Sequence, residues 1–299
     1  MNSTGLTRLG LIGGLLAAGC ATAGCIIVVD GKDGRNGYDG WSSYDEHGHR
    51  GAKVTKRNWS TLVRSEDLQT TESIAIETHA GDIVLMPTEG RPKVRAAARG
   101  LNKERVLDVE VVVEPIDGEL RIAADWPGGE RRHHERIDLV IELPERFGVT
   151  IQTEAGDVIV ESMAGPLTIS TSAGDVEVEA HEGPARVLTS AGDIEMRMIA
   201  GSVDAETSAG DIDLYDVGWP IEARTSAGDI TVAMRHGFAG IMRASTSAGS
   251  IELPGTGTEN RTGGMKTATH TIGGEDAAAE CVFATSAGDI DVRVLKDDD

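Results

Sequence analysis

The sequence predicts an all-β chain folded as a single-stranded β-helix, or β-solenoid, with coils of about 18 residues and an irregular β cap on its N-terminal side. A turn tetrapeptide, Ser-Ala-Gly-Asp, returns at a fixed interval, and short alternating apolar runs flank each copy. A short constant period is typical of solenoids, whose units bury their apolar faces only against neighbouring units. Aromatic residues make up only 3% of the chain while glycines number 38, which favours slim layers closed by tight turns.

The repeat is clearest at its glycine. Five copies are spaced 18 residues apart, an earlier copy stands alone, and two later copies follow at longer intervals. In chain order these glycines are Gly81, Gly156, Gly174, Gly192, Gly210, Gly228, Gly249 and Gly288. Written from residue 149, each regular unit contains two strands and two turns, with inward columns that begin at Val149 and Ile151 before the turn and at Val158 and Val160 after it. We expect these columns to stack from coil to coil.

The turn residues have structural roles. Gly stands at the third turn position, where a type II turn requires positive φ, and the Asp side chain can accept hydrogen bonds from nearby backbone amides. Stacked coils would align Asp157, Asp175, Asp193, Asp211 and Asp229. Neighbouring carboxylates at coil spacing repel by about 1 kcal/mol even in a water-like dielectric. Amide bonds or bound divalent cations must offset this repulsion, and we expect amide capping because Ca²⁺ needs six or more oxygens.

A threonine precedes most of the turns and repeats with them. A stacked column of these hydroxyls can hydrogen-bond along the solenoid axis. Its members are Thr171, Thr189, Thr207, Thr225, Thr246 and Thr285.

The chain divides into five parts. We expect a signal peptide over residues 1–19, a lipid anchor and flexible Gly/Asp-rich tether over 20–67, an irregular β cap with the first coils over 68–148, regular repeats over 149–295 and an acidic tail over 296–299. No helix is expected after the signal. The insertions after Arg235 and between Leu253 and Cys281 should project as loops or an extra arm.

The first 25 residues are typical of an export signal. Arg8 precedes an apolar run over residues 9–18, and small residues lead to Cys20, the predicted lipidation site. Cys25 is a second candidate, and simple secretion remains an alternative. The residues up to Cys20 resemble the lipobox of bacterial lipoproteins, and in a lipoprotein of this type Ala21 after the cysteine implies the outer membrane if the cell has one.

Other reactive side chains have plain interpretations. His47, His49, His133 and His134 are predicted to be solvated loop histidines, since no cysteine or helical spacing accompanies them. Cys281 is expected to act as a small buried hydrophobe. No catalytic residue, metal site or cofactor is predicted.

The net negative charge of the chain limits the classes of partner that it can bind. A formal net charge of −21 and a pI of about 4.7 argue against nucleic acid, whose phosphates need Lys and Arg. Glu177, Glu195 and Asp213 form an outward acidic stripe after the turns. This stripe suits a cationic partner or one bridged by divalent ions, or it serves only to keep the protein soluble.

The Thr-Ser-Ala-Gly-Asp-Ile repeats behind a lipoprotein-like signal resemble a bacterial adhesin family with DUF4097-type β-strand repeats, related to head-GIN-domain proteins. The resemblance covers roughly residues 70–295 and is strongest over 149–253. It implies a single-stranded β-helix exposed at the cell envelope, and it carries over no functional residues because its motif is a turn.

We therefore predict a non-catalytic cell-envelope lipoprotein, in the outer membrane or otherwise secreted, whose β surface contacts a protein or glycan partner or acts as a scaffold. The alternatives are a β-helix polysaccharide lyase or hydrolase, and a Ca²⁺-binding repeat protein. Calcium rolls need Gly-Gly-x-Gly-x-Asp at both turns, whereas the second turn here begins Met163-Ala164-Gly165. Singular residues such as Arg224, Arg235 and His236 are interpreted as ordinary surface groups.

Overall fold

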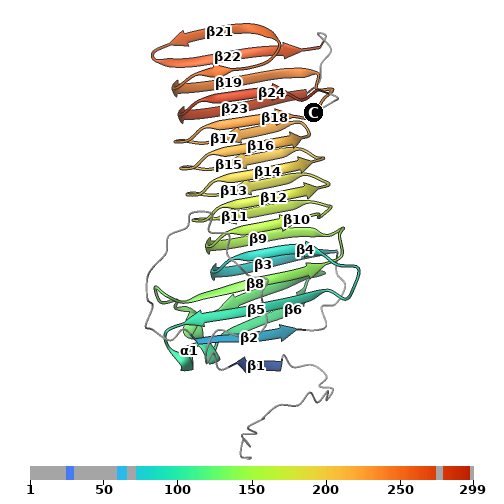
Figure 1. Ribbon diagram of the computed structural model, residues 1–299, viewed down its shortest axis with the longest axis vertical. Helices are drawn as coiled ribbons and strands as arrows, with labels where there is room; N and C mark the ends of the chain where they lie inside the picture. Colours follow the sequence, from blue (N-terminus) through green and yellow to red (C-terminus); the bar gives the residue numbers. More distant parts are fainter. Residues whose placement is uncertain (1–24, 30–58, 66–71, 274–278, 297–299) are drawn as a thin grey trace, which may run out of the picture.

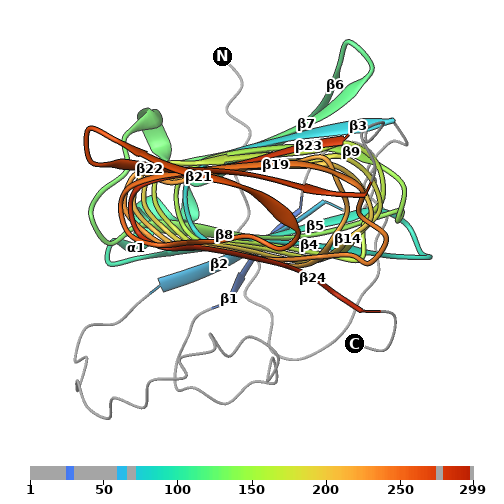
Figure 2. The same ribbon diagram turned by 90° about the horizontal axis from the view of Figure 1, so that it is seen from above.

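A computed structural model describes residues 25–29, 59–65, 72–273 and 279–296. Its coils stack into one elongated body (Figure 1), and two sheets face each other across a narrow core when the stack is viewed from above (Figure 2). The predicted all-β solenoid is confirmed. None of the helices among the described residues has the length and apolar character needed to cross a membrane.

The regular coils each contribute one strand to each sheet. Sheet B receives the first strand of each coil and sheet A the second, and all of these strands pair in parallel. In sheet B they are β9 (Gly148–Ala155), β11 (Leu167–Thr171), β13 (Ala185–Leu188), β15 (Val203–Glu206) and β17 (Ile221–Arg224). In sheet A they are β10 (Val158–Glu161), β12 (Val176–His181), β14 (Ile194–Ile199), β16 (Ile212–Val217) and β18 (Ile230–Met234).

The register reproduces the sequence period. Val158 lies opposite Val176, which lies opposite Ile194, so each inward residue meets its counterpart one coil on. A slip by one residue would turn every apolar side chain to solvent, which fixes this register. The columns predicted to face inward are buried, Ile151, Val158 and Val160 completely so. Burying such a side chain contributes about 1.5–3 kcal/mol, so the stacked columns are the main source of stability.

The N-terminal end contains a coil out of chain order. It is formed by β3 (Ser73–Ala80) and β4 (Ile83–Pro87). β7 (Glu119–Asp125) and β8 (Arg136–Leu143) pair with its outer edges, while β9 and β10 pair with its inner edges. A later part of the chain therefore forms an earlier layer of the stack.

Antiparallel strands complete this end. β5 (Lys93–Gly100) pairs with β8, β2 (Trp59–Ser65) pairs with β5, β1 (Cys25–Val29) pairs with β2, and β6 (Glu110–Ile116) forms a hairpin with β7. β1 and β2 lie within residues 20–67, so these positions are strand and the expectation of a tether is corrected there. The reason is pairing: β2 has a partner in β5 that is distant in sequence.

The cap also contains a helix that the sequence did not predict. α1 (Lys103–Leu107) follows Asn102, whose Oδ1 accepts hydrogen bonds from the amides of Glu104 and Arg105 at 3.0 and 3.2 Å. This N-cap and the buried Val106 stabilise a single turn too short to show apolar periodicity. A 3-10 turn, η1 (Pro127–Gly129), precedes β8.

The C-terminal end contains a second coil out of chain order. β19 (Gly240–Ala248) and β20 (Ile251–Glu252) form the outer coil, and β23 (Ala279–Ala287) and β24 (Ile290–Val294) lie between it and the coil of β17 and β18. The turn at Gly288 thus lies between those at Gly228 and Gly249. β21 (Thr256–Thr262) and β22 (Met265–Ile272) form a hairpin on β19, which confirms the predicted extra arm.

Candidate functional site

The repeated turn glycines have the predicted sign of φ. Their φ values run from 123° at Gly156 to 156° at Gly249. These values exceed the roughly +80° of a type II turn, so the predicted turn type is wrong although the need for glycine is correct.

Stacking supplies a second reason for glycine. A Cβ built on Gly192 would lie 2.1 Å from the carbonyl oxygen of Gly174 in the preceding coil, and one on Gly210 would lie 2.1 Å from that of Gly192. The turns thus approach one another more closely than any side chain allows. This requirement concerns residues in different coils, so turn chemistry within one repeat did not reveal it.

The aspartates form a hydrogen-bond ladder along the solenoid. Oδ1 of Asp157 accepts from the backbone amide of Asp175 at 3.0 Å, and Oδ1 of Asp175 accepts from that of Asp193 at 2.9 Å. Asp211 and Asp229 continue the pattern, each donating its amide to the preceding aspartate at 2.8 Å. These are the bonds that amide capping requires, and the donor lies in the next coil rather than in the same turn.

Residues outside the five regular repeats extend this aspartate ladder at both ends. Toward the N-terminal end Asp82 accepts from the Asp157 amide at 3.3 Å, and Asp138 accepts from the Asp82 amide at 3.2 Å. Toward the C-terminal end Asp289 donates its amide to Asp229 at 2.7 Å and accepts from the amide and hydroxyl of Ser250 at 2.6 and 3.0 Å.

Sequence reasoning missed these end residues to different degrees. Asp82 and Asp289 follow Gly81 and Gly288 and could have been assigned from the motif. Asp138 carries no motif and reaches the ladder only because β8 pairs with β4. It is buried and forms ion pairs with Arg99 and Arg136.

The threonine column forms a parallel ladder. Thr207 Oγ1 donates to the carbonyl oxygen of Gly192 at 3.1 Å, and Thr225 Oγ1 donates to that of Gly210 at 3.0 Å. Thr285 and Thr246 continue it at 3.0 Å, and Lys266 Nζ donates to the last carbonyl, that of Gly249. The predicted axial hydroxyl bonds exist from Thr189 onward, with glycine carbonyls rather than other threonines as acceptors. Thr171 is the exception, because its hydroxyl donates to the Ala173 carbonyl of its own turn at 3.2 Å.

Electrostatics along the aspartate ladder fit this bonding. Burial raises the pKa of Asp157, and the amide bond from Asp175 opposes that rise. The amide and hydroxyl of Ser250 lower the pKa of Asp289 at the end of the ladder. Within the described part of the chain no three His, Cys, Asp or Glu side chains are grouped so that they could hold a metal ion.

The acidic stripe lies on the outer face of sheet A. Glu177 is in register with Glu195, and Glu195 with Asp213. Arg197 forms an ion pair with Glu195 and neutralises part of the stripe. Burial raises the pKa of Asp213, with the neighbouring Asp211 and Asp193 adding to the rise.

Of the singular surface residues, Arg224 lies apart from Arg235 and His236, which are both near Asp216. Arg224 pairs with Glu222 on sheet B, whereas Arg235, just after β18, binds the carboxylate of Asp216 in β16 through two nitrogens at 2.9 and 3.1 Å. His236 follows Arg235 in the loop after β18.

Histidines and cysteines are divided between surface, core and undescribed segments. His133 and His134 lie exposed in the loop before β8, and Cys281 is buried, with its thiol pKa raised by burial to about 11. Cys20, His47 and His49 lie outside the described residues.

His181 is a buried group that the sequence did not single out. It ends β12 in line with Ile199 of β14, and it is 1% exposed. Neither ring nitrogen has a hydrogen-bond partner of good geometry within the described structure. Burial lowers the pKa of His181, although nearby backbone groups of Gly165, Pro184 and Met163 partly oppose this shift.

Two facing parallel sheets, joined by glycine turns and held by side-chain ladders, define the chain as a β-solenoid. It belongs to the Toastrack DUF4097 family, whose model matches residues 69–293. The predicted family resemblance is thereby confirmed.

Solved structures show similar chains. One is a "putative adhesin" from Bacteroides fragilis, with 15% identity, 80% of this chain and 98% of that chain covered, and a TM-score of 0.47. Another is a "putative cell adhesion protein" from Clostridium sporogenes, with 14% identity, coverages of 80% and 100%, and a TM-score of 0.37. A third is a "putative lipid binding protein" from Parabacteroides distasonis, with 12% identity, coverages of 81% and 98%, and a TM-score of 0.37. No curated protein matches the chain.

Proposed function

We propose that this chain is a non-catalytic cell-envelope lipoprotein whose elongated solenoid serves surface contact or scaffolding. The observation that carries the proposal is the aspartate ladder, because its repeated carboxylates bind backbone amides of the next coil. The repeats therefore hold the body together and leave the outer faces of both sheets to meet partners. The predicted signal peptide over residues 1–19, followed by the predicted lipidation site Cys20, supports an envelope location.

The two outer faces differ in charge. Sheet B carries balanced pairs, such as Arg186 with Asp204 at 2.7 Å and Arg243 with Glu280 at 2.6 Å. Sheet A carries the acidic stripe, in which only Glu195 has an arginine partner among the described residues. A protein or glycan partner with cationic groups, or one bridged by divalent ions, would match sheet A.

The anchor is tested by lipid labelling in cells that express the wild type, Cys20→Ala or Cys25→Ala. Incorporation of labelled fatty acid should disappear with Cys20→Ala and persist with Cys25→Ala, which serves as the matched control. The labelled protein should fractionate with the outer membrane and be cleaved by protease added to intact cells. Unlabelled cytoplasmic protein in all three strains would refute the anchored-envelope function.

Contact through sheet A is tested by binding the purified protein to envelope fractions. The variant carries Glu177→Gln, Glu195→Gln and Asp213→Asn, and the control removes three acids from sheet B through Asp204→Asn, Glu206→Gln and Glu280→Gln. Binding should weaken in the first variant only. Equal binding by both would show that the stripe serves solubility, and turnover of a glycan by the purified protein would favour a β-helix lyase or hydrolase instead.

A further inference from the structure

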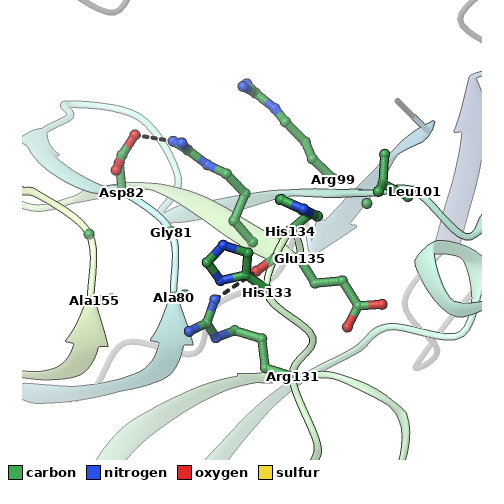
Figure 3. A pocket seen from close by; sticks show the side chains of 13 residues that line it. Ala80, Gly81, Asp82, Arg99, Leu101, Arg131, His133, His134, Glu135 and Ala155 are labelled. Atoms are coloured by element: carbon green, nitrogen blue, oxygen red, sulfur yellow. Dashed lines mark hydrogen bonds and ion pairs between the residues drawn. The ribbon is translucent and has the colours of Figure 1, made fainter. Parts of the chain in front are cut away.

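Cationic side chains gather at one place on this acidic protein. The chain has a net charge of −21, yet residues 131–136 read Arg-Arg-His-His-Glu-Arg. Arg99, Arg131, His133, His134 and Arg136 line a cavity of about 630 Å³ beside the turn glycines Gly81 and Gly156. Figure 3 shows Arg131 and the two histidines around this cavity.

The carboxylates of this cleft are already paired. Arg136 forms ion pairs with Asp82 and Asp138, and Arg99 lies 3.2 Å from Asp138. Arg105 binds both oxygens of Glu135 at 2.7 and 2.9 Å. The carboxylates of the cleft are therefore engaged with the guanidinium groups of Arg99, Arg105 and Arg136 and not with that of Arg131.

Arg131 and the two histidines remain for a ligand. Arg131 donates to the backbone carbonyl of Glu135 at 3.4 Å, and no carboxylate among the described residues pairs with it. The rings of His133 and His134 contact each other edge to face, with centroids 4.7 Å apart. One guanidinium and two imidazoles thus present N–H groups at the rim of the cavity.

The loop that carries them is held in place. The Glu135 side chain is buried and accepts from the Arg132 amide at 2.9 Å, while the Glu135 amide donates to the Arg132 carbonyl at 2.9 Å. Arg105 in turn lies over the Trp126 ring at 5.9 Å. A fixed loop loses little conformational entropy when a ligand binds.

We propose that this cleft binds a phosphate-bearing anion. Guanidinium groups donate paired hydrogen bonds to phosphate oxygens, and the cavity volume is in the range of small-molecule sites. The acidic surface beyond the cleft would repel an extended polyanion, which favours a single phosphate group. The phosphate belongs to a soluble phosphate ester or to a lipid headgroup. A headgroup is included because β1, which follows the predicted lipidation site Cys20 in the chain, lies with β2 and α1 at the same end of the solenoid as the cleft (Figure 1). The site does not depend on lipidation of Cys20.

The test uses the full chain with Cys20→Ala, so that no lipid of its own confounds the binding. Inorganic phosphate and glycerol phosphate are titrated by calorimetry, and vesicles of phosphatidylglycerol in phosphatidylcholine are compared with phosphatidylcholine alone. Arg131→Gln and the pair His133→Gln with His134→Gln should each weaken binding by about tenfold, as expected for loss of hydrogen bonds to an anion. The control Arg293→Gln, an exposed residue of β24 at the other end of the solenoid, removes the same charge and should bind as the wild type does.

Melting temperatures show whether each variant folds. Arg131→Lys keeps the positive charge but loses the paired N–H donors of the guanidinium, so this variant should bind phosphate with intermediate strength. Binding of the phosphates alone identifies a soluble ester, and binding of the anionic vesicles that the cleft variants lose identifies a headgroup. Either result supports the site. Absence of saturable binding to every probe, or binding that folded cleft variants retain in full, would overturn the proposal.

Discussion

At the scale of the residue, the turn glycines meet two separate requirements, positive φ and close stacking. Gly192→Ala should destabilise the protein by more than the roughly 1 kcal/mol of a positive-φ penalty, because its Cβ would also meet the Gly174 carbonyl at 2.1 Å. Gly237→Ala is the matched control, since Gly237 has φ 84° and nothing within 4 Å of the added atom. Urea unfolding measures both variants. An equal loss in both would show that the stacking contact contributes nothing.

The aspartate ladder makes a prediction of its own at Asp193, whose Oδ1 accepts from the Asp211 amide at 2.8 Å. Asp193→Ala should cost about 1 kcal/mol, as loss of a cap does. Asp193→Asn should cost less, because the amide oxygen still accepts the bond and repulsion within the ladder falls. Denaturant midpoints of the two variants decide this. An equal loss for Asn and Ala would mean that the charge itself, rather than the acceptor, holds the turn.

His181 predicts a pH dependence of stability. Its folded pKa is lowered by burial, so the unfolded chain binds the proton more readily, with an ordinary pKa of about 6.5. The stability of the neutral form is fully present above about pH 6.5 and falls as the pH drops from there toward the lowered folded pKa. His181→Met, whose side chain matches Met163 one coil earlier, should remove this part of the dependence. Thermal unfolding across this range measures it, and an unchanged pH profile in the variant would contradict the assignment.

At the scale of the element, each end of the solenoid is closed by a coil out of chain order. β23 and β24 fill the layer between β17–β18 and β19–β20. Deleting residues 279–299 should therefore release β19 to β22 and expose them to protease, while the coils of β9 to β18 stay protected. Deleting residues 297–299 alone is the control and should change nothing. Limited proteolysis followed by mass spectrometry gives the answer, and a protected β19–β22 segment in the longer deletion would show that the coils stack in chain order.

The sequence predicted the regular elements because period and pairing coincide there. Val158, Val176 and Ile194 are 18 residues apart and also neighbours in space. The ends were not predictable in this way. Asp138 joins the aspartate ladder, and the turn at Gly288 comes before the turn at Gly249 in the order of the stack. Both result from pairing between segments distant in sequence, which leaves no local sequence pattern. Likewise the cationic cleft depends on Arg99 from β5 meeting a loop that lies more than thirty residues later.

At the scale of the whole molecule, the coils form one continuous body held by apolar columns and two side-chain ladders. The aspartate ladder passes from Asp138 to Ser250 through both ends of the stack. Because backbone amides occupy its carboxylates, the body should keep its stability without divalent ions. This separates it from a Ca²⁺-binding repeat protein, in which the ion supplies much of the folding free energy.

Thermal unfolding of the full-length protein by calorimetry, in excess Ca²⁺ and in excess EDTA at the same ionic strength, tests this claim most directly. We expect the same midpoint and the same single cooperative transition in both solutions. A midpoint that rises with Ca²⁺ concentration in the wild type and no longer does so in Asp193→Asn would contradict this claim.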